Sequence, residues 1–395
     1  MKRWNEMLEI NLPPTFFVGV NALENFESVF QHIGLEKGKC KLLVITDSGI
    51  VRVGLSKNLE NVLRDAGISY EIFSDVTPNP TNDDVEKCLE VYKKHSCNLI
   101  VALGGGSVMD VAKAVALRLT NEGPITRYEF PNNPQRATTP IITIPTTAGT
   151  GSEATPFCVI IDKTIPKKVV IYSPSIISRI VILDPSLTLS LPKKLTAETG
   201  IDALTHAVES YVSPYANPFS DELALKAIEM IAKNIRIAYK DGKNIDAREK
   251  MLVASTLAGI SFSHAGLGVI HALSHAVSAK FGVSHGLANA LLLPVGMEFN
   301  LPAATEKFAN IAEKFGITAG SKDIVENARK SIDAVKQLLK ELDIPNGLSD
   351  LGITKDDIDE LSKLAFDDAK VCSNPRKIEE LSTVKELYEK VMHLY

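Results

Sequence analysis

The histidines of this chain are concentrated in one region, at spacings that suit metal binding. Five of the eight lie between His206 and His285. Residues Gly200–Glu209 (GIDALTHAVE) have the pattern of a helix, which places Asp202 and His206 four residues apart on one face. Two side chains in this arrangement can bind one ion together.

A second group of histidines follows at the same spacing. Residues Ala265–Ala276 (AGLGVIHALSHA) are predicted to form a further helix, in which His271 and His275 are four residues apart. His285 comes soon afterwards, in FGVSHG, near an expected turn. The spacing alone does not decide which of these imidazoles are ligands.

A single histidine is more often a satisfied core or surface residue than a metal ligand. Several spaced histidines with a carboxylate, on apolar helices where an unpaired polar group is costly, favour a metal site. Three imidazoles and one carboxylate suit Fe(II) or Zn(II) and suit Mg(II) or Ca(II) poorly. We interpret His264 as a non-ligand.

Two loops rich in glycine and hydroxyl side chains indicate nucleotide binding. Leu103–Asp110 (LGGGSVMD) places three glycines between a strand and a helix, where free N–H groups face an anion and Ser107 can cap the helix or bind a phosphate. Three glycines alone are equally consistent with a tight turn that binds nothing. The loop lacks the G-x-G-x-x-G pattern and follows the third strand–helix unit, so an ordinary Rossmann assignment would be wrong in detail.

The second loop, Pro145–Glu153 (PTTAGTGSE), carries three threonines, one serine and two glycines. Its hydroxyl and N–H donors suit a phosphate or a ribose. Asp47 follows the first predicted strand directly, where a carboxylate can bind ribose hydroxyls and repel a 2′-phosphate, which favours NAD over NADP. The structural alternative for Asp47 is a helix cap or a turn.

The first half of the chain alternates short aliphatic runs with helical stretches. This alternation predicts an α/β N-terminal dinucleotide-binding domain with a mostly parallel sheet, over residues 1–192. The expected strands are 41–46, 70–73, 98–103, 141–144, 158–161, 168–172 and 180–183, and the expected helices are 56–66, 82–95 and 107–119.

Strand signals stop after Leu183. From about Lys194 the chain is rich in helix-forming residues, for example at 220–234 and 303–315. The proline-bearing stretch Asp184–Pro192 (DPSLTLSLP) marks the boundary, because proline ends regular structure. We therefore expect an all-α C-terminal metal-binding domain over residues 193–395.

Composition narrows the class of protein. The 395 residues are 45% hydrophobic and 23% charged, with a net charge of -5, which offers no positive field for nucleic acid or an anionic membrane. The five cysteines are scattered without a CxxC pair, which fits a reducing cytoplasm. Neither a secretion signal nor a run of about 18 apolar residues is found, so we expect a cytoplasmic protein without a membrane partner.

Several longer motifs occur together in order along nearly the whole chain. They are TDSG at Asp47, TPNPT at Thr77, GGGSVMD at Gly104, TTAGTGSE at Thr146, GIDALTHAVESY at Gly200 and GLGVIHALSHAVSAKFGVSHG at Gly266. In this combination the chain resembles the iron-containing alcohol dehydrogenase family.

The resemblance implies specific site residues. It places the metal on Asp202, His206, His271 and His285, and makes His275 a pocket residue near the nicotinamide and the substrate. It places the pyrophosphate of NAD on Gly105, Gly106 and Ser107, with Asp110 supporting the loop. It assigns further cofactor contacts to Asp47, Asn79, Thr146, Thr147, Thr150 and Lys167.

The resemblance also implies the reaction, a hydride transfer between a short primary alcohol or diol and NAD that yields an aldehyde. Iron, or alternatively zinc, would polarise the alcohol oxygen. His275 is the candidate proton relay, and a chain of solvent or ribose hydroxyls is the alternative. The stretch Thr155–Cys158 (TPFC) and Phe262 resemble members acting on short alcohols or diols such as 1,3-propanediol, whereas Ser263-His264 departs from the Asn residues common in the family. A homo-oligomer, dimeric or larger, is expected.

Three other functions are weighed against this one. A zinc-type glycerol dehydrogenase is the nearest, but His206 after Asp202 favours the iron-type ligands. A lyase of the dehydroquinate synthase kind would need Lys and Arg around its substrate, and residues 265–279 contain none. A non-catalytic nucleotide-binding protein would have no reason to keep all four metal positions.

Overall fold

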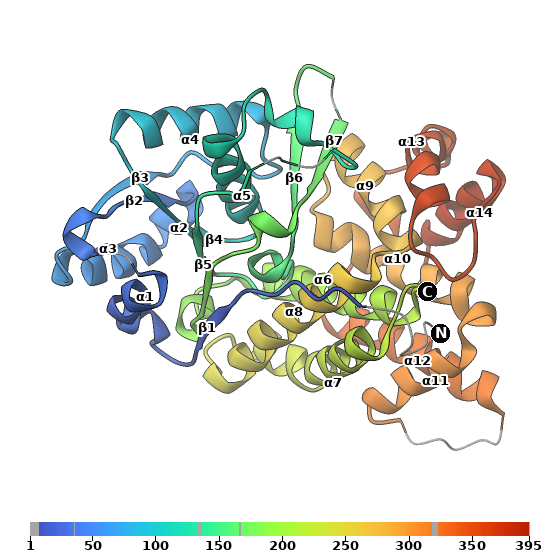
Figure 1. The fold of residues 1–395 in the computed structure, drawn as a ribbon. Helices are drawn as coiled ribbons and strands as arrows, with labels where there is room; N and C mark the ends of the chain where they lie inside the picture. Colours follow the sequence, from blue (N-terminus) through green and yellow to red (C-terminus); the bar gives the residue numbers. More distant parts are fainter. Residues whose placement is uncertain are drawn as a thin grey trace. The chain divides into compact units, whose positions relative to one another are not determined.

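The computed structural model describes residues 8–34, 36–132, 134, 136–165, 167–317 and 323–394. The chain separates into two compact units. The N-terminal unit comprises Glu9–Leu191, and the C-terminal unit comprises the residues from Pro192 onward together with Leu8. Figure 1 shows the helices and strands of both units.

The N-terminal unit is built around a six-stranded parallel sheet with the strand order β1-β8-β5-β4-β2-β3. The strands are β1 (Thr15–Val18), β2 (Lys41–Ile45), β3 (Ser69–Phe73), β4 (Leu99–Gly104), β5 (Ile141–Pro145) and β8 (Ile180–Leu183). The helices are α1 (Phe26–Ile33), α2 (Ser48–Arg52), α3 (Leu55–Asp65), α4 (Asn82–Lys94) and α5 (Gly106–Thr120). This is the α/β architecture that the alternating sequence predicts.

Helices cover both faces of this sheet (Figure 1), which explains why its strands are almost wholly apolar. Along β2, Leu43 and Ile45 face the core shared with α4 and α5, whereas Leu42 and Val44 face the core shared with α1 and α3. Successive residues of a strand point to opposite faces of the sheet. Because both faces are covered here, the strand appears in the sequence as one continuous hydrophobic run.

The structure corrects one feature of the predicted sheet. The strands β6 (Phe157–Asp162) and β7 (Lys167–Tyr172) do not join the parallel sheet but form a separate antiparallel pair. They alternate between buried and partly exposed residues, as expected for a pair with one covered face. The edge strand β1 was not predicted, because its four residues are too short a pattern.

The register of the sheet brings the two glycine-containing loops together. Gly104 at the end of β4 lies beside Pro145 at the end of β5, and the N–H of Thr146 donates to the carbonyl of Gly104 over 3.0 Å. On the other side of β4, the hydroxyl of Thr46 donates to the carbonyl of Leu103 over 2.8 Å. Parallel strands thus place the segments that follow β2, β4 and β5 at one edge of the sheet.

The regular elements of the C-terminal unit, among its described residues, are all helices, as predicted. Its helices are α6 (Lys193–Val212), α7 (Pro218–Lys240), α8 (Ile245–Ala265), α9 (Val269–Phe281), α10 (His285–Asn300), α11 (Thr305–Lys314), α12 (Ile324–Glu341), α13 (Ile358–Val371) and α14 (Leu381–Val391). No single helix in the described ranges is both long and apolar enough to cross a bilayer. Only α8 and α9 taken together reach that length and composition, and a bend of 109° separates them.

The prediction of one continuous helix over residues 265–276 is wrong. The helix α8 ends at Ala265. The next residue, Gly266, has φ 78°, and a right-handed helix cannot continue through a residue with a positive φ. A new helix, α9, starts at Val269. His271 therefore lies in the first turn of a helix and not in its middle.

Lys113 anchors the second loop to α5. Its side chain is fully buried, and its ammonium group donates to the carbonyls of Ser152 and Phe157 over 2.6 and 2.7 Å. It also donates to the hydroxyls of Ser152 and Thr155 over 3.0 and 3.1 Å. Four acceptors around one buried cation fix this loop against the helix.

We predict that Lys113→Met lowers the free energy of unfolding by about 3 kcal/mol, since it leaves these buried acceptors unpaired. The measurement is urea unfolding of the full chain followed by circular dichroism. The matched control is Lys57→Met on the exposed face of α3, which should change stability by less than about 0.5 kcal/mol. Equal midpoints for the two variants would contradict the anchoring role.

Candidate active site

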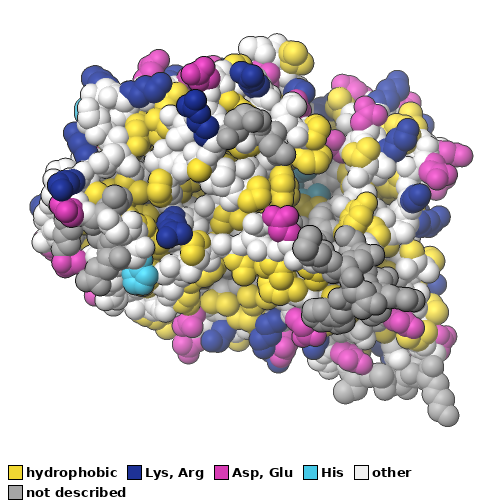
Figure 2. Space-filling model, in the orientation of Figure 1, with side chains coloured by type: hydrophobic (Ala, Val, Ile, Leu, Met, Phe, Trp, Pro, Cys, Tyr) yellow, Lys and Arg dark blue, Asp and Glu magenta, His cyan; other side chains and the backbone are white. Residues whose placement is uncertain are grey.

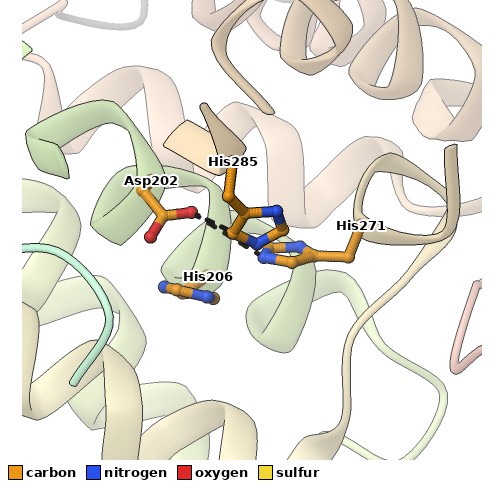
Figure 3. Close-up of side chains that lie close together, drawn as sticks. All are labelled: Asp202, His206, His271 and His285. Carbon is orange, nitrogen blue, oxygen red and sulfur yellow. Dashed lines mark ion pairs between the residues drawn. The ribbon is translucent and has the colours of Figure 1, made fainter. Parts of the chain in front are cut away.

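Four predicted metal ligands converge in the C-terminal unit (Figure 3). Asp202 and His206 lie on α6, His271 on α9 and His285 on α10. One ligand atom from each lies within 4.8 Å of all the others. The Asp202 Oδ1 atom is 4.0 Å from His271 Nε2 and 3.8 Å from His285 Nε2.

The surroundings of the cluster are dry and packed. Asp202, His206 and His271 are each less than 5% exposed, while His285 retains about a third of its side-chain surface. The ring of His206 is stacked between His271 and Phe262, with a centroid separation of 4.6 Å to each. The partly open side of the cluster is therefore at His285.

The donor set suits a divalent transition metal. A buried carboxylate normally needs a cationic partner, but no Lys or Arg of the described ranges pairs with Asp202. One carboxylate and three imidazoles match the ligand preferences of Fe(II) and Zn(II). The residues present thus fit a bound ion of this kind.

Gly286 allows α10 to approach α6 closely. A Cβ atom at this position would lie 2.4 Å from the backbone oxygen of Glu198, which is too close for any side chain. The adjacent residue, His285, begins α10, so its imidazole is brought to the helix that carries Asp202. The glycine is required by packing at a position next to a ligand.

Asn289 is a site residue that the sequence reasoning missed. Its Nδ2 atom lies 2.7 Å from Asp202 Oδ1, 3.1 Å from His271 Nε2 and 3.2 Å from His285 Nε2. Its Oδ1 atom is buried without a hydrogen bond from any described residue. The available signal was its position four residues after His285, on the same face of a helix.

Glu209 is the second missed residue. It is 1% exposed, and one carboxylate oxygen lies 2.5 Å from His271 Nδ1. Burial raises the pKa of Glu209 to about 8, against the opposing effect of the backbone N–H groups of Gly268, Ile270 and His271. A cation held by the cluster would oppose the rise further. The signal was its spacing, seven residues after Asp202 on α6.

His275 lies beside the cluster, on the next turn of α9 after His271. Its ring stacks on His285 at a centroid separation of 5.4 Å, and its Nδ1 atom is 3.7 Å from Asp368 Oδ2. His264 lies apart from the cluster, with Nδ1 2.7 Å from the carbonyl of Ile260. The structure thus brings together the four expected ligands and His275, and leaves His264 outside.

The two loops of the N-terminal unit pack directly against each other. Gly105 caps α5 without a side chain, and a Cβ there would be 3.3 Å from Thr147 Oγ1. A Cβ on Gly106 would be only 2.7 Å from Thr150 Cγ2. Thr146 Oγ1 is buried without a hydrogen-bond partner among the described residues. Glycine is therefore needed for loop contact as well as for any approach of a phosphate.

Asp110 links the same two loops. Its Oδ1 atom accepts a hydrogen bond of 3.2 Å from the hydroxyl of Ser152. Desolvation raises the pKa of Asp110 to about 6, with Lys113 as the largest opposing influence. These contacts are within the protein, which agrees with a supporting position for Asp110.

The remaining predicted cofactor residues are placed less closely together. Asp47 caps α2, with Oδ1 accepting from Gly49 and Ile50 over 2.8 and 3.0 Å, so the structural alternative holds for one of its oxygens. Asn79 is exposed with φ 55°. The ammonium group of Lys167 pairs with Glu129, and the described contacts do not join it to the glycine loops. Ser107 lies in the first turn of α5.

The segment Thr155–Cys158 is largely buried within the N-terminal unit. Thr155 binds Lys113, and Cys158 is 1% exposed in the core, where burial raises the pKa of its thiol. Phe262 is different, because its ring stacks on His206. Of the residues linked to substrate choice, Phe262 is the one that contacts the ligand cluster.

Comparisons with known proteins identify the family of this chain. The family model "Iron-containing alcohol dehydrogenase" matches residues 13–185, and "Fe-containing alcohol dehydrogenase family, C-terminal" matches residues 196–392. The NAD-dependent methanol dehydrogenase of Bacillus methanolicus is 35% identical over 381 residues, which cover 96% of this chain and 98% of that protein. The 1,3-propanediol dehydrogenase of Citrobacter freundii is 40% identical over 373 residues, covering 94% and 95%.

Solved structures extend the similarity to the complete fold. A crystal structure of 1,3-propanediol oxidoreductase is 37% identical, covers 98% of this chain and 100% of its own, and gives a TM-score of 0.93. Sequence and fold agree over both units, including the segments that carry the ligand cluster and the paired loops. The chain belongs to the iron-containing alcohol dehydrogenase family.

Proposed function

We propose that this enzyme oxidises short primary alcohols or diols to aldehydes with NAD, or runs the reverse reduction. The N-terminal domain, residues 1–192, binds the dinucleotide, and the C-terminal domain, residues 193–395, binds iron, with zinc as the alternative. The observation that carries the proposal is the convergence of one carboxylate and three imidazoles within 4.8 Å. The family membership supplies the reaction class.

Asp202, His206, His271 and His285 are proposed to hold the ion. When bound, a divalent ion supplies a Lewis acid that lowers the pKa of an alcohol oxygen. The partial exposure of His285 leaves an approach on that side of the cluster. The packed rings of His206, His271 and Phe262 exclude water on the other side.

His275 is proposed to receive the proton that the alcohol releases. It stacks on His285, so it lies next to the open side of the cluster. Its Nδ1 atom faces Asp368, a carboxylate that is 61% exposed and can pass a proton to solvent. The remaining bond change is hydride transfer, for which NAD supplies the acceptor.

The paired loops are proposed to bind the dinucleotide. Gly105, Gly106 and Ser107 present the N-terminus of α5 to the pyrophosphate, and Asp110 stabilises the loop. The buried hydroxyl of Thr146 has a donor or acceptor to spare, and Thr147 and Thr150 lie against the glycines. Asp47, Asn79 and Lys167 are proposed as more peripheral cofactor contacts.

The proposed substrate class follows the relatives, which include a methanol dehydrogenase and 1,3-propanediol dehydrogenases. On the face shown in Figure 2, basic and acidic side chains are interspersed, so this face offers no broad positive field for a polyanion. A homo-oligomer and a cytoplasmic location stay predictions.

The function is tested by anaerobic reconstitution with Fe(II) or Zn(II), followed by a panel of alcohols and aldehydes with NAD(H) and NADP(H). We expect NADH formation from short primary alcohols or diols only in metal-loaded protein. The measurement is cofactor absorbance. Metal-loaded protein that binds NAD but forms no NADH with any alcohol would favour a non-catalytic nucleotide-binding protein.

The metal site is tested by His271→Ala. Because His271 supplies one of four donors, we expect metal affinity to fall by more than about 100-fold. This exceeds the usual effect of losing a residue that only hydrogen-bonds to a ligand. Nucleotide affinity should be nearly unchanged, since the paired loops belong to the other unit. Metal content by mass spectrometry and NAD binding by calorimetry separate the two. His264→Ala is the matched control. If His271→Ala lost the binding of both the metal and NAD, the two binding sites would not be separate.

The cofactor preference is tested by Asp47→Asn. Asparagine caps a helix as well as aspartate does, so the start of α2 is preserved while the charge is removed. We expect the ratio of kcat/KM for NAD to that for NADP to fall by about tenfold, or about 1.4 kcal/mol. An unchanged ratio would remove Asp47 from the cofactor site.

A further inference from the structure

The helix that carries His271 is capped by a side chain from another helix. The residue before α9 is Gly268, which has no side chain to bind the free N–H groups of the first turn. Glu209, on α6, accepts a hydrogen bond of 2.6 Å from the N–H of Ile270. A Cβ on Gly268 would lie 2.9 Å from Glu209 Oε1, so glycine makes room for this carboxylate.

The same carboxylate holds the ring of His271. While Oε1 binds the backbone of α9, Oε2 lies 2.5 Å from His271 Nδ1. A cation held by the cluster favours the ionised form of Glu209, which only accepts hydrogen bonds, so Nδ1 of His271 carries the proton in this contact. The tautomer that remains has its lone pair on Nε2.

The opposite ring nitrogen faces the ligand cluster. His271 Nε2 is 4.0 Å from Asp202 Oδ1 and 3.1 Å from Asn289 Nδ2. An imidazole can turn about its terminal torsion with little preference, so burial alone does not choose between the two nitrogens. The contact with Glu209 fixes both the rotation and the tautomer of the ring.

Glu209 belongs to the same helix as two of the ligands. It lies seven residues after Asp202 and three after His206, so one rigid helix sets the positions of two donors and of the group that orients a third. Carboxylates in this arrangement raise the basicity of a metal-binding imidazole. The geometry therefore links ligand orientation to helix packing.

We propose that Glu209 is the positioning residue of the metal site. Its carboxylate accepts a hydrogen bond from the Nδ1–H group of His271 and so directs Nε2 of that ring to the ion. The inference rests on the proposed function, since it requires the ion to be held by this cluster. It adds a fifth residue on which metal affinity depends, although Glu209 itself does not touch the ion.

The test is Co(II) binding to the full-length protein, measured by competition with a chelator and by the visible ligand-field spectrum. We expect Glu209→Ala to bind Co(II) about 10- to 100-fold more weakly than wild type, with an altered spectrum, because the His271 ring is no longer fixed. If Glu209→Ala does not fold, Glu209→Gln carries the test. It keeps the side-chain volume and removes the charge, and the same direction of change is expected.

A capping effect must be separated from an effect on the ring. Asn374 is the matched control, because its Oδ1 atom accepts from the N–H of Val269 over 3.2 Å at the same helix end. Among the described hydrogen bonds of Asn374, none joins it to the His271 ring. Asn374→Ala should lower the thermal unfolding midpoint while leaving Co(II) affinity and the spectrum unchanged.

The outcomes are distinguishable. Wild-type affinity and spectrum in the folded Glu209 variants would overturn the positioning role while leaving the metal site intact. A loss of affinity in Asn374→Ala as large as that in Glu209→Ala would also overturn it, since capping would then account for both. Wild-type protein that binds no Co(II) would refute the proposed metal site itself.

Discussion

The need to place one carboxylate and three imidazoles inside an apolar helical interior governs the C-terminal unit. Each of these groups loses water on burial, and together they form a concentration of lone pairs that a divalent cation can compensate. Neighbouring features follow from this constraint. Gly286 lets α10 approach α6, and Phe262 closes one side of the cluster. Glu209 contacts the far ring nitrogen of His271, and Asn289 donates to the Oδ1 atom of Asp202.

In the proposed function the N-terminal unit meets a different constraint, which is to present backbone N–H groups and hydroxyls to an anion. A parallel sheet does this without any dedicated charged side chain, because every strand ends at the same edge and each following helix starts there. Lys113 is a buried charged residue of this unit and Asp110 a partly buried one, but both bind groups of the loop itself. The site is thus shaped by packing between two loops, in which Gly106 and Thr150 are in contact.

In the proposed function the two units also divide the chemistry. The nicotinamide cofactor carries the redox step and the metal provides electrostatic activation, so the protein contributes mainly positions and protonation states. This division explains why most side chains of the site hold other protein groups as well. Asp47 caps a helix, Asp110 binds Ser152, and Glu209 caps α9 while it binds His271.

Local patterns in the sequence determined the element types, the mostly parallel α/β half, the helical half and the candidate ligands. Hydrophobic periodicity and i, i+4 spacing act over a few residues, so they can be read directly. Patterns were insufficient where distant segments compete. Two features show this: β6 pairs with β7 outside the main sheet, and the expected helix breaks at Gly266. The residue types allow this backbone geometry but do not require it.

The choice between His271 and His275 shows the limit most clearly. Both residues have ligand spacing, and the sequence pattern left them equivalent until the family resemblance separated them. The fold distinguishes them physically, because Glu209 and Asn289, 62 and 18 residues away along the chain, contact the ring of His271 on its two nitrogens. The sequence alone therefore determined which side chains were available for the site. Only tertiary structure decided which of them meet, because long-range packing and buried hydrogen bonds set their positions.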